Sequence, residues 1–387
     1  MRFFGVPGRV AAALAAGVTV LAGATPATSA GPAPGTPIAV VARPPGWRDM
    51  PGTGSALEYW TTGSDGSVLP ATGAVLIPSG PVPEGGWPIL AFDHGSLGLG
   101  PGCGGQSEPE RGPWVEQRVR EDVFLRGFLT KGFAVVAPDY LGLGRFDTGT
   151  HPYLELKTEA SATVDMVDAA RAAHPELGRR WVVLGGSQGG QAALGTARSA
   201  RKLAPDLDFR GSVVIDPGSD IETLLPMAGP WGPDLPSVYG DALTAFVVSV
   251  FAGLRVARPD IDIEGYLTPR GRRILDAADK RCLDEIADMV AGVGISDLLA
   301  EPLGDEHFRA VIADYLGVPT SGYDRPILLL LNAFDTTAPS PLHAALVARL
   351  AAGGADQRVV WGAGRHMQLN GEMRAALDDF LDRARAS

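Results

Sequence analysis

The sequence predicts an α/β fold: a mostly parallel central sheet with helices on both faces and an inserted helical cap. Short apolar runs alternate with helix-periodic segments along most of the 387 residues. Strands that are joined through helices favour parallel pairing in a sheet that is covered on both sides. The alternation stops between about residues 220 and 323, where only helical patterns occur. We therefore expect a helical insertion between two strands of the sheet.

The strand-like runs are apolar, four to eight residues long and rich in Val, Ile and Leu. They are Ala74 to Pro78, Pro88 to Phe92, Phe133 to Ala137, Trp181 to Leu184, Ser212 to Ile215, Ile327 to Leu331 and Arg358 to Trp361. The helical patterns of the core lie between or after them, at Glu116 to Lys131, Leu154 to Ala173, Gln188 to Lys202, Pro341 to Ala352 and Gly371 to Ala386.

The predicted cap contains helical patterns at Tyr239 to Leu254, Arg270 to Asp288 and His307 to Leu316. The part from Ala242 to Leu254 is almost wholly apolar but too short to cross a bilayer. Such a helix suits the lining of an acyl pocket and equally the packing of a cap onto a core. The expected organisation is a leader (1–30), a first core part (31–219), the cap (220–323) and a second core part (324–387).

The N-terminus has the pattern of a secretory signal peptide. Arg2 and Arg9 precede the uncharged stretch Val10 to Ala24, and small residues at Thr28 to Ala30 follow. A membrane anchor is the alternative, but only about 18 uncharged residues are present and no second apolar span follows. We expect cleavage near Ala30, an extracellular protein and no stable membrane anchor.

The composition disfavours a nucleic-acid role and permits one disulfide. The net charge is −11, and 33 basic residues are scattered among 44 acidic ones, so no basic stripe is available for phosphates. Cys103 and Cys282 are the two cysteines, and export permits them to pair, with two buried free thiols as the alternative. The pair alone makes neither a zinc site nor a redox motif.

The most informative motif is Gly185-Gly186-Ser187-Gln188-Gly189, which separates the apolar run Trp181 to Leu184 from a helical pattern. A tight strand-to-helix turn with glycine two residues before and after a serine exposes the hydroxyl at the N-terminus of the next helix. Ser187 is therefore the candidate nucleophile. The alternative is an ordinary serine in a glycine-rich turn.

A serine hydroxyl needs a base, and the base needs an orienting carboxylate. We prefer His366 among six histidines, because it follows the last strand across a flexible loop; His151, His174, His307 and His343 are expected to be structural or solvated. Asp335, which follows the strand Ile327 to Phe334, is the preferred acid. Asp216 is the main rival because it too follows a strand, and Asp139 is a weaker one.

Acyl transfer also requires donors for an oxyanion. The backbone N–H of Gln188, directly after the nucleophile, supplies one. The second is expected from the loop after Pro88 to Phe92, at Gly95 or Ser96, between which the sequence does not decide. A plain glycine-rich turn is the alternative, with His94 then only structural.

These pieces together resemble the secretory lipases of the α/β-hydrolase superfamily, the group that includes fungal lipase A. The resemblance runs from about Ile38 to Leu381. It rests on Phe92 to Gly95, Ala137 to Gly142, Gly185 to Gly189, the helical cap, Asn332 to Asp335 and Gly364 to His366. Fungal members carry a further disulfide near the C-terminus, for which this chain has no cysteines, and Gly95 replaces their acidic residue at the oxyanion loop.

The resemblance implies Ser187 as nucleophile, Asp335 as acid, His366 as base and a bridge between Cys103 and Cys282. It also implies hydrolysis of carboxylic esters, acylglycerols among them, without a cofactor. We expect no metal site, and a lipid or other ester substrate that a lipid–water interface can present. Alternatives are a short-chain carboxylesterase, an acyltransferase with the same triad, a peptidase, and a non-catalytic binding protein on a hydrolase scaffold. The sequence does not fix the oligomeric state.

Overall fold

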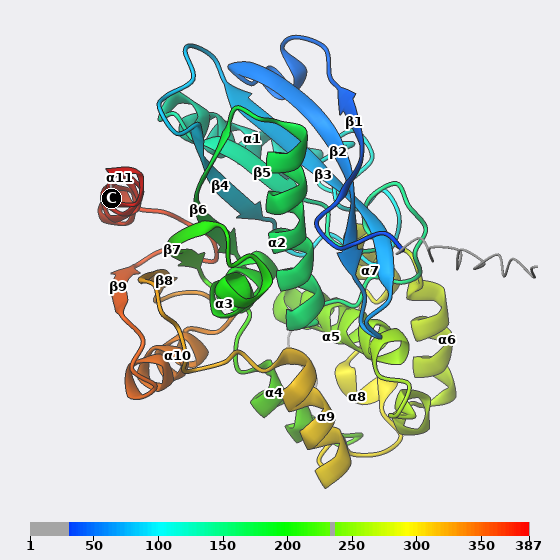
Figure 1. The fold of residues 1–387 in the computed structure, drawn as a ribbon. Helices are drawn as coiled ribbons and strands as arrows, with labels where there is room; N and C mark the ends of the chain where they lie inside the picture. The colour runs from blue at the N-terminus through cyan, green and yellow to red at the C-terminus, as the bar shows by residue number, and fades with distance from the viewer. Residues whose placement is uncertain (1–30, 233–236, 387) are drawn as a thin grey trace, which may run out of the picture. The chain divides into compact units, whose positions relative to one another are not determined.

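A computed structural model describes residues 31–232 and 237–386, in which a nine-stranded sheet carries helices on both faces (Figure 1). The predicted signal peptide, residues 1–30, lies outside the described residues. The strands are β1 (Pro37–Ala42), β2 (Gly52–Thr62), β3 (Val68–Pro78), β4 (Trp87–Asp93), β5 (Ala134–Pro138), β6 (Leu177–Gly186), β7 (Asp208–Ile215), β8 (Ile327–Asn332) and β9 (Gln357–Gly362).

The sheet has the order β1-β2-β3-β5-β4-β6-β7-β8-β9. The strands β1, β2 and β3 pair antiparallel, and β3 also pairs antiparallel with β5. From β5 through β4 to β9 every neighbouring pair is parallel. The sheet is thus mostly parallel, as predicted. The predicted runs account for β3 to β9, whereas β1 and β2 were not expected.

Helices cover both faces of the sheet because its side chains alternate between two apolar layers. In β8, Leu329 and Leu331 pack in the layer that contains residues of α2, α3 and α10, while Leu328 and Leu330 pack with α1 and α11. These core helices are α1 (Val115–Thr130), α2 (Leu156–Ala173), α3 (Gln188–Leu203), α10 (Ser340–Ala352) and α11 (Gly371–Ala386).

Between β7 and β8, the described chain contains helices and no strand. These are α4 (Ile221–Leu224), α5 (Ser237–Ala257), α6 (Pro269–Ala278), α7 (Leu283–Met289), α8 (Ile295–Leu298) and α9 (Glu306–Leu316), with short 3-10 helices at Leu225–Met227 and Ile263–Tyr266. A further 3-10 helix, Trp47–Asp49, lies outside this segment, between β1 and β2. The helices of the segment pack around an apolar cluster that includes residues of α5, α6, α7 and α9 together with Leu99, Tyr153 and Leu154. The exact division into core and cap stays a prediction.

One predicted helix of this segment was wrong. The pattern from Arg270 to Asp288 is two helices, α6 and α7, rather than one. The chain turns at Lys280, whose φ is 58°, a left-handed value that interrupts helical backbone. Cys282, two residues later, is held to the core by a disulfide, so a tertiary constraint overrides the local helical pattern.

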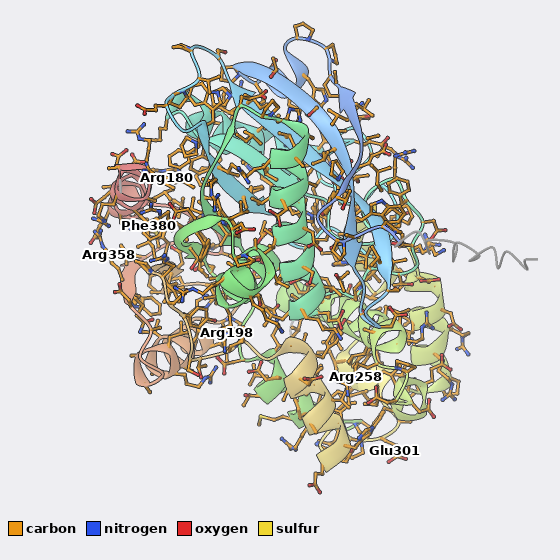
Figure 2. All side chains as sticks on the ribbon, in the orientation of Figure 1. Arg180, Arg198, Arg258, Glu301, Arg358 and Phe380 are labelled. Atoms are coloured by element: carbon orange, nitrogen blue, oxygen red, sulfur yellow. A yellow bond between two sulfur atoms is a disulfide. The ribbon has the colours of Figure 1, made fainter. Side chains whose placement is uncertain are left out.

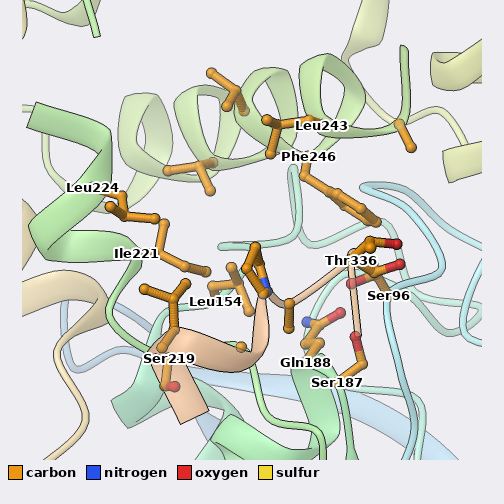
Figure 3. A pocket seen from close by; sticks show the side chains of 18 of the residues that line it. Ser96, Leu154, Ser187, Gln188, Ser219, Ile221, Leu224, Leu243, Phe246 and Thr336 are labelled. Atoms are coloured by element: carbon orange, nitrogen blue, oxygen red, sulfur yellow. The ribbon is translucent and has the colours of Figure 1, made fainter. Parts of the chain in front are cut away.

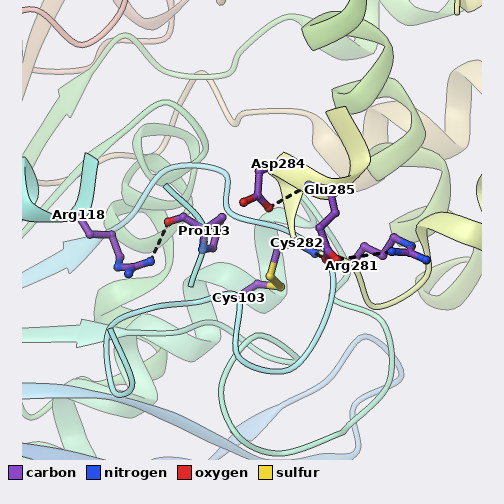
Figure 4. The surroundings of a disulfide bond; sticks show 7 residues. All are labelled: Cys103, Pro113, Arg118, Arg281, Cys282, Asp284 and Glu285. Carbon is purple, nitrogen blue, oxygen red and sulfur yellow. Dashed lines mark hydrogen bonds and ion pairs between the residues drawn. A yellow bond between two sulfur atoms is a disulfide. The ribbon is translucent and has the colours of Figure 1, made fainter. Parts of the chain in front are cut away.

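The two cysteines are bonded to each other, which excludes the alternative of free thiols (Figure 4). The bridge joins the loop after β4 to the start of α7. Backbone hydrogen bonds reinforce it on both sides: Leu99 N–H donates to Arg281 O at 2.8 Å, and Leu283 N–H donates to Leu97 O at 2.9 Å. The helical segment is therefore fastened to the same loop that begins at Gly95 and Ser96.

Arg198, Arg358 and Glu301 are among the charged side chains that lie exposed on the unit that begins at Pro32 (Figure 2). None of the helices in residues 31–232 and 237–386 combines the length and the apolar character that a bilayer crossing requires.

Candidate active site

The parallel strands all end at one edge of the sheet, and the candidate residues follow those ends. Gly186 pairs with Ile215 at the ends of β6 and β7, and Asn332 pairs with Gly362 at the ends of β8 and β9. Loops after parallel strands meet at this edge, which is where open α/β sheets bind ligands. The fold thereby brings to one edge the ends of β4 and β9, Asp93 and Gly362, which are 269 residues apart in the sequence (362 − 93).

Ser187 occupies the single-residue turn between β6 and α3. Its φ of 58° and ψ of −122° are strained for a residue with a side chain. The turn is possible because its neighbours are glycines: a Cβ at Gly185 would overlap the carbonyl of Gly189, and a Cβ at Gly189 would overlap the carbonyl of Asp93. The serine stands at the N-terminus of α3, where unpaired N–H groups favour developing negative charge.

A cavity of about 1000 Å³ opens above Ser187 (Figure 3). Ser96 and Gln188 lie beside the serine, while α5 crosses the opposite side with Leu243 and Phe246. The remaining wall is mostly apolar and includes Leu154, Ile221, Leu224, Leu225, Val247, Val250 and Phe334. The cavity thus joins one polar end, which contains the serine, to a long apolar wall.

Asp335 and His366 are in direct contact. Nδ1 of His366 lies 2.6 Å from Oδ2 of Asp335, and the aspartate side chain is fully buried. The other oxygen, Oδ1, accepts the N–H groups of Thr337 at 2.8 Å and Ala338 at 3.0 Å. Burial raises the pKa of Asp335, but the hydrogen bonds from His343 and His366 outweigh it, so the net pKa lies below its usual range. The carboxylate stays charged beside the imidazole.

The loop of His366 reaches the cavity of Ser187. Ala363, Arg365 and Gln368 line that cavity, and a Cβ at Gly186 would overlap the side chain of Met367. Within the described chain, however, no hydrogen bond joins Oγ of Ser187 to His366. The structure therefore pairs the candidate base with the candidate acid and sets their loops around the serine. Catalytic hydrogen bonds often tighten only when substrate is bound.

Asp216, the rival acid, has other partners. Its carboxylate accepts the backbone N–H of Asn332 at 2.7 Å, the Asn332 side-chain amide at 2.6 Å and the N–H of Met367 at 2.8 Å. It makes no hydrogen bond to the ring of His366 among the described contacts. Asp139, the weaker rival, is buried and accepts hydrogen bonds from Gln106, Ser107 and Thr72. The imidazole is thus paired with Asp335.

The candidate oxyanion donors surround the serine. Gln188 is the first residue of α3, so its N–H has no partner within the helix. Gly95 lies beside the elbow, since a Cβ placed on it would lie 3.7 Å from the Cβ of Ser187. In the described chain, the N–H groups of Gly95 and Ser96 have no intramolecular acceptor. Both therefore remain candidates for the second donor.

A buried polar network holds the side chain of Gln188. Its amide nitrogen donates to Glu159 Oε1 at 2.6 Å and lies 3.0 Å from His151 Nε2. Nδ1 of His151 lies 2.8 Å from the Leu141 carbonyl and so carries the proton, which leaves Nε2 as an acceptor. Burial raises the pKa of Glu159 and lowers that of His151 to about 3, so His151 is neutral at physiological pH.

The contact between His343 and Asp335 was missed by the sequence analysis. His343 was expected to be structural or solvated inside a helix, and it is indeed fully buried on α10. Its Nε2, however, lies 3.2 Å from Oδ2 of Asp335, the same oxygen that contacts His366. A signal was present, because His343 shares a helical stripe with the apolar Leu346 and Leu350, where a polar residue requires a buried partner.

The other histidines lie outside the contact between Asp335 and His366. His94 and His151 are buried, and their Nδ1 atoms contact the carbonyls of Gly95 and Leu141, respectively. His174 contacts the hydroxyl of Ser55 at 3.3 Å, and His307 contacts the carbonyl of Asp260 at 3.3 Å.

One group of residues in the described chain has metal-ligand spacing. Atoms of Asp216, Asp335 and His343 lie within 4.8 Å of one another. The carboxylate oxygens of both aspartates already accept hydrogen bonds from the chain, and His343 Nε2 contacts Asp335. Each of the three side chains therefore already has a polar partner in the described chain.

Comparison with known proteins identifies lipases and esterases. A family model described as secretory lipase matches residues 117–315. A probable inactive lipase of Mycobacterium tuberculosis is 23% identical over 264 residues, which cover 66% of this chain and 55% of that protein. The chain thus spans little more than half the length of this curated relative.

Two solved structures are similar over nearly the whole chain. Candida antarctica lipase A matches with a TM-score of 0.71 at 17% identity, covering 91% of this chain and 82% of that one. The rice cell wall degrading esterase LipA of Xanthomonas oryzae matches with a TM-score of 0.69 at 19% identity, covering 92% and 96%. At these identities the similarity shows the fold alone, and it confirms the predicted α/β-hydrolase fold.

Proposed function

Because this chain belongs to the secretory lipase family, we propose that it hydrolyses carboxylic esters of lipids through Ser187, His366 and Asp335. The observation that carries the proposal is the strained serine at the polar end of a large apolar cavity. The contact between His366 and Asp335 supports the assignment of base and acid, since an imidazole needs a carboxylate on Nδ1 to present Nε2 to a serine.

In the proposed mechanism, Oγ of Ser187 attacks the ester carbonyl while Nε2 of His366 takes its proton. The N–H groups of Gln188 and of Gly95 or Ser96 stabilise the alkoxide; removing one such donor costs about 3 kcal/mol of barrier. His366 then protonates the leaving alcohol, which departs and leaves an acyl group on Ser187. Water, deprotonated by His366, then attacks the acyl group. The bond from the acyl carbon to Oγ breaks, His366 returns the proton to Oγ of Ser187, and the carboxylic acid is released.

The cavity supports an acyl chain as the apolar part of the substrate. Leu224 and Phe334 line it and are nevertheless 45% and 65% exposed, so its rim is apolar as well as its interior. Burying a methylene group contributes roughly 0.8 kcal/mol, so a long wall favours long acyl chains. An apolar rim also suits substrate that is presented at a lipid–water interface.

Secretion belongs to the same proposal. The family name, the disulfide between Cys103 and Cys282, and the leader pattern in residues 1–30 support an extracellular enzyme. No cofactor is needed for this chemistry.

The test compares purified protein with its Ser187→Ala variant on p-nitrophenyl esters of increasing chain length and on emulsified triglyceride. We expect wild-type turnover to fall by about 10⁴-fold or more in the variant. Ester turnover that survives in Ser187→Ala contradicts the proposal. A preference for butyrate over longer esters and over triglyceride identifies the short-chain esterase instead, and capture of most acyl groups by an added alcohol identifies the acyltransferase.

The curated Mycobacterium tuberculosis relative bears the name of a probable inactive lipase, so activity itself is the property to measure first. A protein without ester turnover that also fails to react with a fluorophosphonate is a binding protein on a hydrolase scaffold.

A further inference from the structure

The end of β7 holds the backbone of the nucleophile. Ser187 N–H donates to Ile215 O at 3.0 Å, and Gly218 N–H donates to Ser187 O at 3.0 Å. Asp216 lies between these two contacts, with a φ of 39° that a residue with a side chain rarely adopts. Such strained backbone persists where the surroundings determine it strongly. The backbone around Asp216 is therefore fixed relative to the serine.

The side chain of Asp216 holds the segments that carry the other two residues. Its fully buried carboxylate accepts the backbone N–H and one side-chain N–H of Asn332, three residues before Asp335. It also accepts the N–H of Met367, the residue directly after His366. Hydrogen bonds to a carboxylate are roughly twice as strong as neutral ones, and burial prevents water from replacing them.

Asn332 extends this hold to both sides of the His366 loop. Its Oδ1 accepts Gly364 N–H at 3.1 Å, and its Nδ2 donates to Gln368 O at 3.0 Å as well as to Asp216. Both protons of the amide and its oxygen are therefore used. The loop from Gly364 to Gln368 is held at both ends by one buried pair, Asp216 and Asn332.

His343 stands between the two buried carboxylates. Its Nε2 lies 3.2 Å from Asp335 Oδ2 and 3.6 Å from Asp216 Oδ1. Because ionised carboxylates only accept hydrogen bonds, Nε2 carries a proton. The shorter contact is a hydrogen bond, and the longer one places the same N–H beside the carboxylate of Asp216.

We propose that Asp216 is the positioning residue of this site, which fixes the loops of Asp335 and His366 relative to Ser187. We also propose that His343 holds the carboxylates of Asp216 and Asp335 in fixed positions relative to each other. The proposal rests on the proposed function, in which Asp335 and His366 act on Ser187. It gives Asp216 no contact with substrate. It explains why a second aspartate follows β7, where the sequence alone made it a rival acid.

The direct test is Asp216→Asn. Asparagine has one acceptor oxygen where the carboxylate has two, so its amide group faces at least one of the present N–H donors and the loop is released. Since a displacement of about 1 Å at a catalytic group can cost 10²-fold, we expect kcat to fall about 10- to 100-fold. KM should change less than about twofold, because the apolar wall that binds the substrate does not include Asp216.

A readout independent of turnover is the low-field proton NMR signal of His366 Nδ1–H, assigned by its loss in His366→Gln. We expect the signal in the wild type and its broadening or loss in Asp216→Asn. The matched control is Asp165→Asn on α2, a buried aspartate whose carboxylate accepts from Thr61 on β2. The control should keep both the signal and kcat, even where it lowers the melting temperature.

A second pair of variants leaves Asp216 unchanged and tests the role of His343 separately. His343→Leu removes the donor to Asp335, whereas His343→Gln offers an amide N–H at similar reach. We expect His343→Leu to lower kcat about 10-fold and His343→Gln to restore most of it. Equal kcat in the two variants contradicts the role of His343.

Three results overturn the inference. The first is a folded Asp216→Asn variant with wild-type kcat and an unchanged His366 signal. The second is a loss in Asp216→Asn as complete as in Ser187→Ala while Asp335→Asn stays active, which makes Asp216 the catalytic acid. The third is an equal loss in Asp165→Asn. Failure of the proposed function is distinct: the wild type then lacks ester turnover, whereas the His366 signal still reports on positioning in the resting protein.

Discussion

His366 Nδ1 and Asp335 Oδ2 lie 2.6 Å apart, with the carboxylate fully buried and the imidazole partly exposed. This contact fixes the proton on Nδ1 and leaves Nε2 free to act as a base. Asp335 is itself held by two backbone N–H groups and by His343, so its position does not depend on His366. The imidazole is thus oriented by a carboxylate that is already in place.

Asp335→Asn should lower kcat by about 10⁴-fold, because an amide can hold the wrong imidazole tautomer and cannot stabilise the imidazolium. Rates on a soluble p-nitrophenyl ester measure the loss, and circular dichroism checks folding. A folded variant that retains more than about a tenth of wild-type kcat contradicts the role of Asp335.

Asp93 should make the protein less stable as the pH rises. Burial raises the pKa of Asp93 to about 8, and the Thr163 hydroxyl donates a hydrogen bond to its Oδ1 at 2.6 Å. The unfolded chain releases this proton near its ordinary pKa of 3.8, whereas the folded chain keeps it until about 8. The stabilisation is therefore complete below pH 3.8 and is lost as the pH rises through 8.

Asp93→Asn mimics the protonated acid and should remove this pH dependence. Each pKa unit corresponds to roughly 1.4 kcal/mol, so several kcal/mol should separate the variant from the wild type at pH 9, in favour of the variant. Thermal unfolding at pH 5 and pH 9 measures the difference. A wild type that is the more stable of the two at pH 9 rules out a buried, protonated Asp93.

Removing the disulfide with Cys103→Ser and Cys282→Ser together should lower the free energy of unfolding by about 2 to 5 kcal/mol. The bond closes a loop of 179 residues, and the backbone hydrogen bonds of Leu99 and Leu283 keep the native loop in place without it. Urea unfolding measures the change, and kcat on a short ester should stay within about threefold. Unchanged stability in the double variant contradicts this account of the bridge.

Leu243→Asp should reduce kcat/KM on long-chain esters about tenfold or more and leave short-chain esters nearly unaffected. Leu243 lines the cavity on α5, so a carboxylate there is unfavourable beside an acyl chain. Val256→Asp is the matched control, since Val256 is exposed on the same helix and does not line the cavity. Equal losses on butyrate and on long-chain esters place the acyl chain elsewhere.

Much of the fold follows from local patterns. The strands from β3 to β9 and the five core helices coincide with predicted runs because apolar alternation and helical periodicity agree there with burial. The strands β1 and β2 were missed. β1 is largely exposed, and the mixed composition of β2 resembles neither a buried strand nor a helix. Their antiparallel pairing with β3 is decided by tertiary contact.

The candidate site likewise contains some residues that local sequence patterns mark and others that only tertiary contacts reveal. Ser187 is marked by its flanking glycines, and His366 and Asp335 by their places after the last two strands. The roles proposed for Asp216 and His343 depend on contacts between β7, β8, α10 and the last loop, which no local pattern encodes. Position after a strand could make Asp216 a rival acid but could not show which of two aspartates meets the imidazole.

The most direct test of the central assignment is covalent labelling with a fluorophosphonate, followed by peptide mass spectrometry. The account predicts one adduct per chain, on Ser187, that forms rapidly in the wild type and far more slowly in His366→Gln. An adduct on another residue, or wild-type protein that turns over esters while Ser187 stays unlabelled, would contradict it.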